Sequence, residues 1–205
     1  MEEILLGIIA IIIGYLLGAI PTAYIVARLR KGIDIRDVDV GNMGGGNVLR
    51  QVGIWEGALV IVVDMAKGAA AILIAQAMGI SLPWVLGAGF AALLGHNYPV
   101  YVGFRGGQGV ACIMGIFFIL TPLAMAVPFV AMGVPLLITR RKFPHFLFVT
   151  ICIICPLLPI SIWLFYGSEI LLLYYALFII AFLLFKSRRR LKELKVVISK
   201  FNKEA

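Results

Sequence analysis

The chain has 205 residues, of which 62% are hydrophobic and 14% charged, and its 18 lysines and arginines against 10 acidic residues give a net charge of +8. This composition excludes a soluble globular protein, and the continuously apolar runs exclude a β-barrel, whose strands alternate apolar and polar residues. We therefore predict an all-α integral membrane protein that forms a single domain over residues 1–205.

Apolar segments that could cross a bilayer follow one another along the whole chain. A membrane helix needs about 20 apolar residues to span the hydrocarbon. The fourth and fifth segments are shorter and are separated only by Thr121 and Pro122, which predict a tight hairpin because proline often opens a helix. We predict a bundle of about seven transmembrane helices over residues 4–28, 57–78, 83–101, 109–121, 122–139, 146–166 and 170–186.

The positive charges fall on one side of this arrangement. With the N-terminus outside, nearly all lysines and arginines lie in the inside segments, and the outside turns contain none. Cytoplasmic loops are enriched in these residues, so the pattern predicts an N-out, C-in orientation. Residues 187–205 place apolar residues at helical spacing among lysines, which predicts a basic amphipathic tail on the membrane surface. Attraction to anionic membrane lipid accounts for the net charge, and no nucleic acid partner is expected.

Two glycine-rich segments lie on the predicted inside face, and each has an arginine nearby. Glycine and asparagine tolerate left-handed backbone conformations that point successive N–H groups toward an anion. Arg50 and Arg105 can add planar donors suited to phosphate. A flexible linker would have a similar composition, but two such segments on one face suggest one site. The residues that we expect to bind substrate there are Asn42, Gly44, Gly45, Gly46, Asn47, Gly106, Gly107, Gln108 and Gly109.

Asp64 and Lys67 are charged residues inside the second predicted span, three positions apart. Charges in the hydrocarbon are costly and commonly functional, although a structural ion pair at this helical spacing is the alternative. His96 lies at the inner end of the third span, where an imidazole can donate to a phosphate, act as a base or cap helix carbonyls. We predict that Asp64 binds substrate and that Lys67 and His96, with Arg50 and Arg105, are catalytic.

Missing motifs exclude several kinds of catalysis. His96 and His145 lie far apart in the sequence with no aspartate or glutamate beside either, so no catalytic metal site is expected. No serine stands in a Gly-x-Ser-x-Gly motif. His96 is also not followed by the aspartate that marks the common acyl-CoA-dependent acyltransferases. We therefore predict a phosphate site that uses neither a covalent nucleophile nor a cofactor.

Three blocks of residues stand in order along the chain. They are Gly41-Asn42-x-Gly44-x-x-Asn47-x-x-Arg50, then Asp64-x-x-Lys67-Gly68, then Gly95-His96-x-x-Pro99 followed by Phe104-x-Gly106-Gly107-x-Gly109-Val110-Ala111. In this order, within a seven-span N-out chain, they resemble the PlsY family of bacterial membrane acyltransferases. The resemblance covers nearly the whole chain.

The resemblance implies an activity and a location. Members of the PlsY family move an acyl chain from acyl phosphate to glycerol 3-phosphate and produce lysophosphatidic acid in phospholipid biosynthesis. The chain is therefore expected to take both compounds as substrates. The resemblance also implies a multi-pass protein of the bacterial inner (plasma) membrane, which we expect to be a monomer.

The sequence departs from the family pattern at several positions. The first loop of the family usually has a serine and a threonine where this chain has Val40 and Gly46. The second loop usually has two lysines, where this chain has Arg105 and Gln108. Arginine keeps the charge of lysine with a different geometry, whereas glutamine loses it. The histidine and asparagine of the third family motif fall at two positions that we predict to bind substrate, Ser187 and Arg190.

Two other functions remain open. A divergent paralogue could acylate another acceptor or bind phospholipid precursors without turnover. A small-anion or lipid transporter would also suit an intramembrane pair such as Asp64 and Lys67 and helices interrupted by glycine. Against transport, the glycine-rich loops are predicted on one face instead of meeting at the middle of the membrane.

Overall fold

The computed structural model describes residues 1–39, 41–138, 146–167 and 169–204, with side chains for residues 1–39, 41–131, 151–167 and 169–188. Val40, His145 and the side chain of Arg190 therefore lie outside the described part. Every regular element within it is helical, which confirms the predicted all-α class. The elements are α1 (Glu2–Ala19), α2 (Thr22–Lys31), α3 (Gly45–Gln51), α4 (Ile54–Ala77), α5 (Leu82–Asn97), the 3-10 helix η1 (Val100–Val102), α6 (Val110–Leu120), α7 (Pro122–Ile138), α8 (Phe146–Tyr166) and α9 (Ile170–Glu204).

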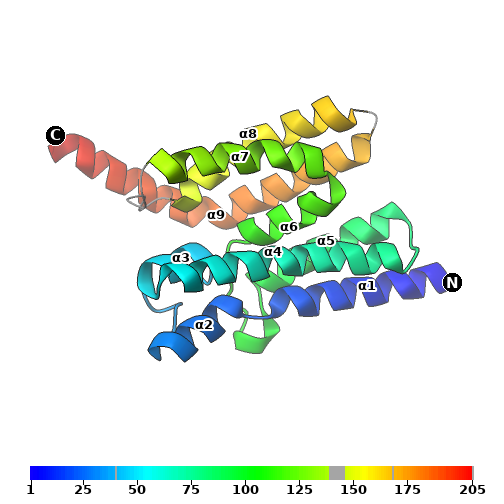
Figure 1. Ribbon diagram of the computed structural model, residues 1–205, viewed down its shortest axis with the longest axis horizontal. Coiled ribbons are helices and arrows are strands. Elements are labelled where there is room, and N and C mark those ends of the chain that lie inside the picture. The colour runs from blue at the N-terminus through cyan, green and yellow to red at the C-terminus, as the bar shows by residue number, and fades with distance from the viewer. Residues whose placement is uncertain (40, 139–145, 168, 205) are drawn as a thin grey trace.

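The helices form two groups that meet along α6 (Figure 1). In the first group, α1 packs along α5, both contact α4, and the short α3 lies on α4. In the second group, α7 packs against α8, which also contacts α9. Helix α6 packs on α4 and touches α7 and α9, so it joins the two groups. Its buried residues Ile113, Ile116 and Phe117 belong to the apolar cluster that both groups share.

Glycines let several helices approach each other closely. A Cβ at Gly18 of α1 would overlap the carbonyl of Ala92 on α5, and one at Gly68 of α4 would overlap the carbonyl of Cys112 on α6. Membrane helices associate through van der Waals packing, and small residues bring their backbones together. These glycines therefore set the spacing of the first group and of its junction with α6.

The first predicted span, residues 4–28, is not one continuous helix. Helix α1 ends at Ala19, Ile20 has an extended backbone with φ −56° and ψ 116°, and α2 begins at Thr22. Pro21 explains the break, because proline lacks the N–H that would continue the helix and its ring clashes with the carbonyl four residues before it. The interruption leaves the Ile20 carbonyl without the helical N–H partner four residues on, so it needs other hydrogen-bond donors.

Two other expected boundaries are also wrong. The third span was expected to reach residue 101, but α5 ends at Asn97 and Tyr98 leaves the helical region because the residue before a proline disfavours it. The first glycine-rich segment, residues 41–50, was expected to form a loop, yet α3 begins at Gly45, with Gly44 preceding it as an extended cap. Gly46 therefore has helical backbone geometry.

Among the described residues, three helical stretches are long and apolar enough to cross a membrane. The chain is thus an all-α membrane protein, while the number of seven spans and the orientation stay predictions. The backbone of the predicted tail is helical through Glu204 and continues directly from the last of these stretches. The three stretches are Glu2–Lys31, Ile54–Ala77 and Ile170–Arg188.

Candidate functional site

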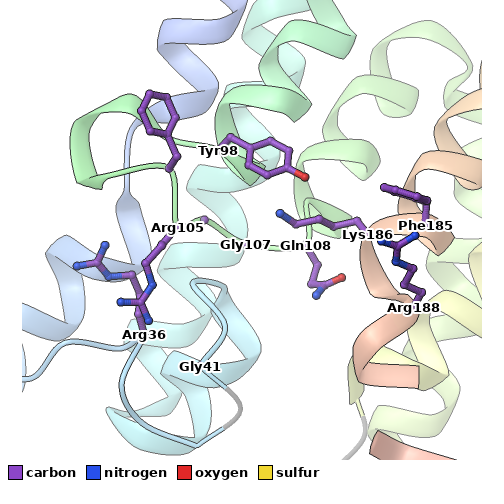
Figure 2. Close-up of a pocket in the computed structure, with 11 residues that line it drawn as sticks. Arg36, Gly41, Tyr98, Arg105, Gly107, Gln108, Phe185, Lys186 and Arg188 are labelled. Carbon is purple, nitrogen blue, oxygen red and sulfur yellow. The ribbon is translucent and has the colours of Figure 1, made fainter. Parts of the chain in front are cut away.

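A pocket of about 500 Å³ lies where the loops that follow α2 and α5 face the middle of α9 (Figure 2). Four of its lining side chains are cations, and no described lining residue is a carboxylate. Arg36 and Arg105 lie together on the loop side, whereas Lys186 and Arg188 come from α9. The lining residues are Arg36, Gly41, Tyr98, Phe104, Arg105, Gly106, Gly107, Gln108, Phe185, Lys186 and Arg188.

The second glycine-rich loop, residues 103–109, is fixed by backbone contacts. The amide of Phe104 donates to the carbonyl of Pro99 at 2.9 Å, and the amide of Gly107 donates to the carbonyl of His96 at 3.1 Å. Gly107 has no room for a side chain, because a Cβ would overlap the His96 imidazole and lie 2.5 Å from the carbonyl of Met43. The two glycine-rich segments therefore meet at Gly107.

Arg36 is held firmly at the pocket wall. Its Nη2 lies 2.7 Å from Asp34 Oδ2, its Nη1 donates to the carbonyl of Val102 at 2.6 Å, and its guanidinium lies 5.0 Å from the centre of the Tyr24 ring. The hydrogen bonds between the two side chains lower the pKa of Asp34 and raise the pKa of Arg36. The Asp34 carboxylate also offsets part of the positive charge that Arg36 presents to the pocket.

Lys186 joins α9 to the end of α5. Its Nζ lies 3.7 Å from the centre of the Tyr98 ring and donates to the carbonyl of Asn97 at 3.4 Å (Figure 2). Arg105 is 66% exposed and lies 3.6 Å from Asp37, which is 65% exposed. Such exposed ion pairs are weak, so Arg105 can turn toward an entering anion at little cost.

Gln108 and Ser187 form a buried contact between the glycine loop and α9. The Ser187 hydroxyl donates to Gln108 Oε1 at 2.5 Å, and the two residues are 1% and 5% exposed. Both were predicted to bind substrate, and both are positions at which the chain departs from the pattern described above. Two of the departures therefore meet in one neutral hydrogen bond at the pocket.

The charged pair predicted inside the membrane, Asp64 and Lys67, lies beside His96, and all three residues lie outside the pocket lining. Asp64, Lys67 and His96 are 2%, 5% and 5% exposed, and none of them is a lining residue. Lys67 Nζ lies 2.6 Å from Asp64 Oδ1 and donates to the carbonyl of Ile20 at 2.7 Å. His96 Nδ1 lies 3.7 Å from Asp64 Oδ1.

Most residues predicted in the first glycine-rich segment do not line the pocket. Arg50 forms an ion pair with Asp39, with Nη2 2.7 Å from Oδ2. Asn47 is buried, and its Nδ2 donates to the carbonyls of Ile35 and Asn42 at 3.0 Å each, which stabilises the loop before α3. Glycines 44–46 cap and open α3 behind this loop, and Gly109 caps the start of α6. Their predicted roles toward a substrate stay predictions.

Comparison with known proteins identifies the family. Residues 8–196 match the family model described as glycerol-3-phosphate acyltransferase. This chain belongs to the glycerol-3-phosphate acyltransferase family. It is 41% identical over 138 residues to glycerol-3-phosphate acyltransferase 1 of Dehalococcoides mccartyi, covering 64% of this chain and 66% of the relative. It is also 44% identical over 126 residues to glycerol-3-phosphate acyltransferase 1 of Deinococcus radiodurans, covering 62% and 63%. The chain thus spans slightly under two thirds of the length of these relatives.

Solved structures extend the similarity to the fold. The crystal structure of PlsY, an integral membrane glycerol 3-phosphate acyltransferase, in its glycerol 3-phosphate form is 32% identical, with a TM-score of 0.78 over 93% of this chain and 92% of that one. The lysophosphatidic acid form is 30% identical, with a TM-score of 0.77 and the same coverage. The resemblance to the PlsY family is therefore confirmed.

Sequence reasoning missed several residues of the pocket. Arg36 was not singled out, although it follows Asp34 in a polar segment on the predicted inside face. Tyr98 and Lys186 were also missed, because only the fold brings the end of α5 against α9. One sequence feature could have indicated Lys186 as a pocket residue: it is the first charged residue after the last apolar run.

Proposed function

We propose that this chain transfers an acyl chain from acyl phosphate to glycerol 3-phosphate and releases lysophosphatidic acid. The observation that carries the proposal is the pocket with four lining cations and no carboxylate among its described lining residues. Both substrates contain phosphate, and arginine binds phosphate through strong charge-assisted hydrogen bonds. Family membership, and the similarity to PlsY in its glycerol 3-phosphate and lysophosphatidic acid forms, support the same substrates.

The proposed reaction needs no nucleophile from the protein. A hydroxyl oxygen of glycerol 3-phosphate bonds to the acyl carbon, the bond from that carbon to the phosphate oxygen breaks, and phosphate leaves with the bonding electrons. In the proposed reaction the hydroxyl proton passes to the departing phosphate. The cations bring the two anions together and stabilise the negative charge on the leaving group.

The surroundings of the pocket suit a lipid product. Tyr98, Phe104 and Phe185 line it and are 38%, 57% and 57% exposed, so apolar surface lies directly beside the cations. We infer that the pocket faces the cytoplasm of a seven-span, N-out monomer in the bacterial inner membrane, with the acyl chain among the helices. The excess of lysine and arginine in the predicted inside segments supports this orientation.

A second candidate is binding without turnover, or transfer to a different acceptor. The observation that favours it is the neutral contact between Gln108 and Ser187. At these two positions the family usually carries a lysine and a histidine, so the chain has less positive charge where a phosphate would be held. Arg188, which lines the pocket, supplies a charge nearby.

A matched pair of arginine variants tests the proposal. Arg105→Ala removes a pocket cation that is 66% exposed, whereas Arg30→Ala removes one that is 67% exposed and pairs with Glu56 away from the pocket. The assay supplies palmitoyl phosphate and radiolabelled glycerol 3-phosphate to protein in nanodiscs and measures labelled lysophosphatidic acid. Losing a charge-assisted hydrogen bond to phosphate should lower kcat/KM about ten- to hundredfold in Arg105→Ala, with no change in Arg30→Ala.

The possible results separate the candidate functions. Equal activity of the two variants would contradict a phosphate site at Arg105. A folded protein that binds glycerol 3-phosphate in calorimetry without forming lysophosphatidic acid would favour the second candidate. Uptake of labelled phosphate into liposomes containing the protein would instead support a transporter.

A further inference from the structure

The chain buries charge that the proposed reaction does not use. Asp64, Lys67 and His96 are at least 95% buried and lie outside the pocket lining. Burying a charge is unfavourable unless it is paired and hydrogen-bonded. The three side chains therefore need a role that does not depend on touching substrate.

Their first connection is to the break between α1 and α2. The ammonium of Lys67 lies 2.6 Å from Asp64 Oδ1 and donates to the Ile20 carbonyl at 2.7 Å. The break leaves this carbonyl without its helical N–H partner, and in the described backbone only the amide of Thr22 also donates to it, at 3.0 Å. Lys67 thus ties α4 to the break and satisfies an acceptor that would otherwise be poorly paired.

Their second connection is to the glycine loop of the pocket. Asp64 Oδ1, which holds Lys67, also lies 3.7 Å from Nδ1 of His96. The opposite edge of the imidazole, at Nε2, fills the space where a Cβ of Gly107 would be. The backbone carbonyl of His96 accepts the amide of Gly107 at 3.1 Å, and Gly107 lines the pocket.

We propose that Asp64, Lys67 and His96 are positioning residues, which hold the loop over residues 103–109 against the α1–α2 break so that its pocket-lining part keeps one shape. The imidazole acts as a support beneath Gly107 and transfers no proton. The proposal rests on the proposed function of the pocket. How well ordered the loop is can nevertheless be measured without turnover.

Hydrogen–deuterium exchange of the full chain in nanodiscs measures that order directly. His96→Ala removes the support, and Asp64→Asn combined with Lys67→Met removes the charges without leaving either one unpaired. In both variants, exchange in peptides covering residues 103–110 should rise about tenfold, while peptides from α1 and α5 keep the rates of the unmodified protein. Ser161→Ala is the matched control, because Ser161 is a buried polar residue of α8 that donates to the Ala124 carbonyl at 2.8 Å.

A conservative variant separates positioning from proton transfer. In His96→Gln an amide fills the same space beneath Gly107, but it cannot exchange protons as an imidazole does. Exchange in the loop and the KM for glycerol 3-phosphate should both stay within about threefold of the unmodified protein. An inactive His96→Gln with a well-protected loop would overturn the proposal, since it would show that the imidazole is needed for chemistry.

Two other results would also overturn it. Unchanged loop exchange in His96→Ala and in the Asp64→Asn, Lys67→Met variant would show that these residues do not hold the loop. Faster exchange throughout α1, α5 and the loop alike would show a general structural role. Absence of acyl transfer by the unmodified protein would refute the proposed function and leave the exchange experiment valid.

Discussion

Removing the hydroxyl of Ser187 tests whether the contact between α9 and the glycine loop shapes the pocket. Ser187→Ala deletes the donor of the 2.5 Å hydrogen bond to Gln108 Oε1. Gln108, which loses this partner, is only 5% exposed. A buried polar atom left without a partner costs about 1–3 kcal/mol. Because Gln108 lines the pocket, we expect about 1 kcal/mol of this cost to appear as weaker binding, which raises the Kd for glycerol 3-phosphate about fivefold.

Ser161→Ala is the matched control for this prediction. Ser161 is 2% exposed, as buried as Ser187, and its hydroxyl donates to the Ala124 carbonyl at 2.8 Å, but Ala124 lies outside the pocket lining, whereas Gln108 is a lining residue. Thermal unfolding followed by tryptophan fluorescence should show similar losses of stability in both variants, whereas calorimetry should show a raised Kd only for Ser187→Ala. An unchanged Kd in both would refute the reasoning. Adding Gln108→Leu to Ser187→Ala removes both polar groups and should restore stability.

Two further predictions concern packing and acidity. Gly68→Ala places a methyl group against the Cys112 carbonyl of α6 and should lower the unfolding free energy by about 1–3 kcal/mol. Gly87→Ala is the control, because its Cβ would lie 3.5 Å from Ile11 and should not lower the unfolding free energy. Equal unfolding midpoints of the Gly68→Ala and Gly87→Ala variants would contradict the close approach of α4 and α6. The pKa of Asp34 is lowered from 3.8 by its hydrogen bonds to Arg36, so the stability it contributes is present above that value and is lost as the pH falls through the lowered pKa. Fluorescence-detected acid unfolding should show this loss in the unmodified protein and not in Asp34→Asn; superimposable curves would contradict it.

Much of the fold could be predicted because the membrane restricts the choices. Backbone groups in hydrocarbon must pair within their own segment, so continuous apolar runs become helices. The break at Ile20 could not be placed in the same way, although Pro21 is visible in the sequence. Proline is tolerated inside membrane helices when other groups satisfy the affected backbone, and here the Ile20 carbonyl accepts a side-chain donor from Lys67, which lies far along the chain.

Only those parts of the candidate site whose residues lie close together in the sequence could be predicted. Glycines close together in sequence indicated the two loops, and their shared predicted side indicated that they meet. The contribution of α9 depends on contacts between Tyr98 and Lys186 and between Gln108 and Ser187, which no local pattern encodes. Likewise, a cationic side chain does not reveal its partner: Arg50 pairs with Asp39 outside the pocket lining, whereas Arg36 pairs with Asp34 and still lines the pocket.

The origin of the pocket walls has a consequence for how the protein is made. One wall comes from the loops after α2 and α5, and the other comes from Phe185, Lys186 and Arg188 of α9. The residues of the two walls are synthesised in order from the N-terminus, so the earlier helices can insert and pack while α9 is still being synthesised. Until α9 is in place, Gln108 lacks its hydrogen bond from Ser187 and Tyr98 lacks its cation–π contact with Lys186. The nascent chain therefore stays without a complete pocket, and insertion of α9 is the step of biogenesis that completes it.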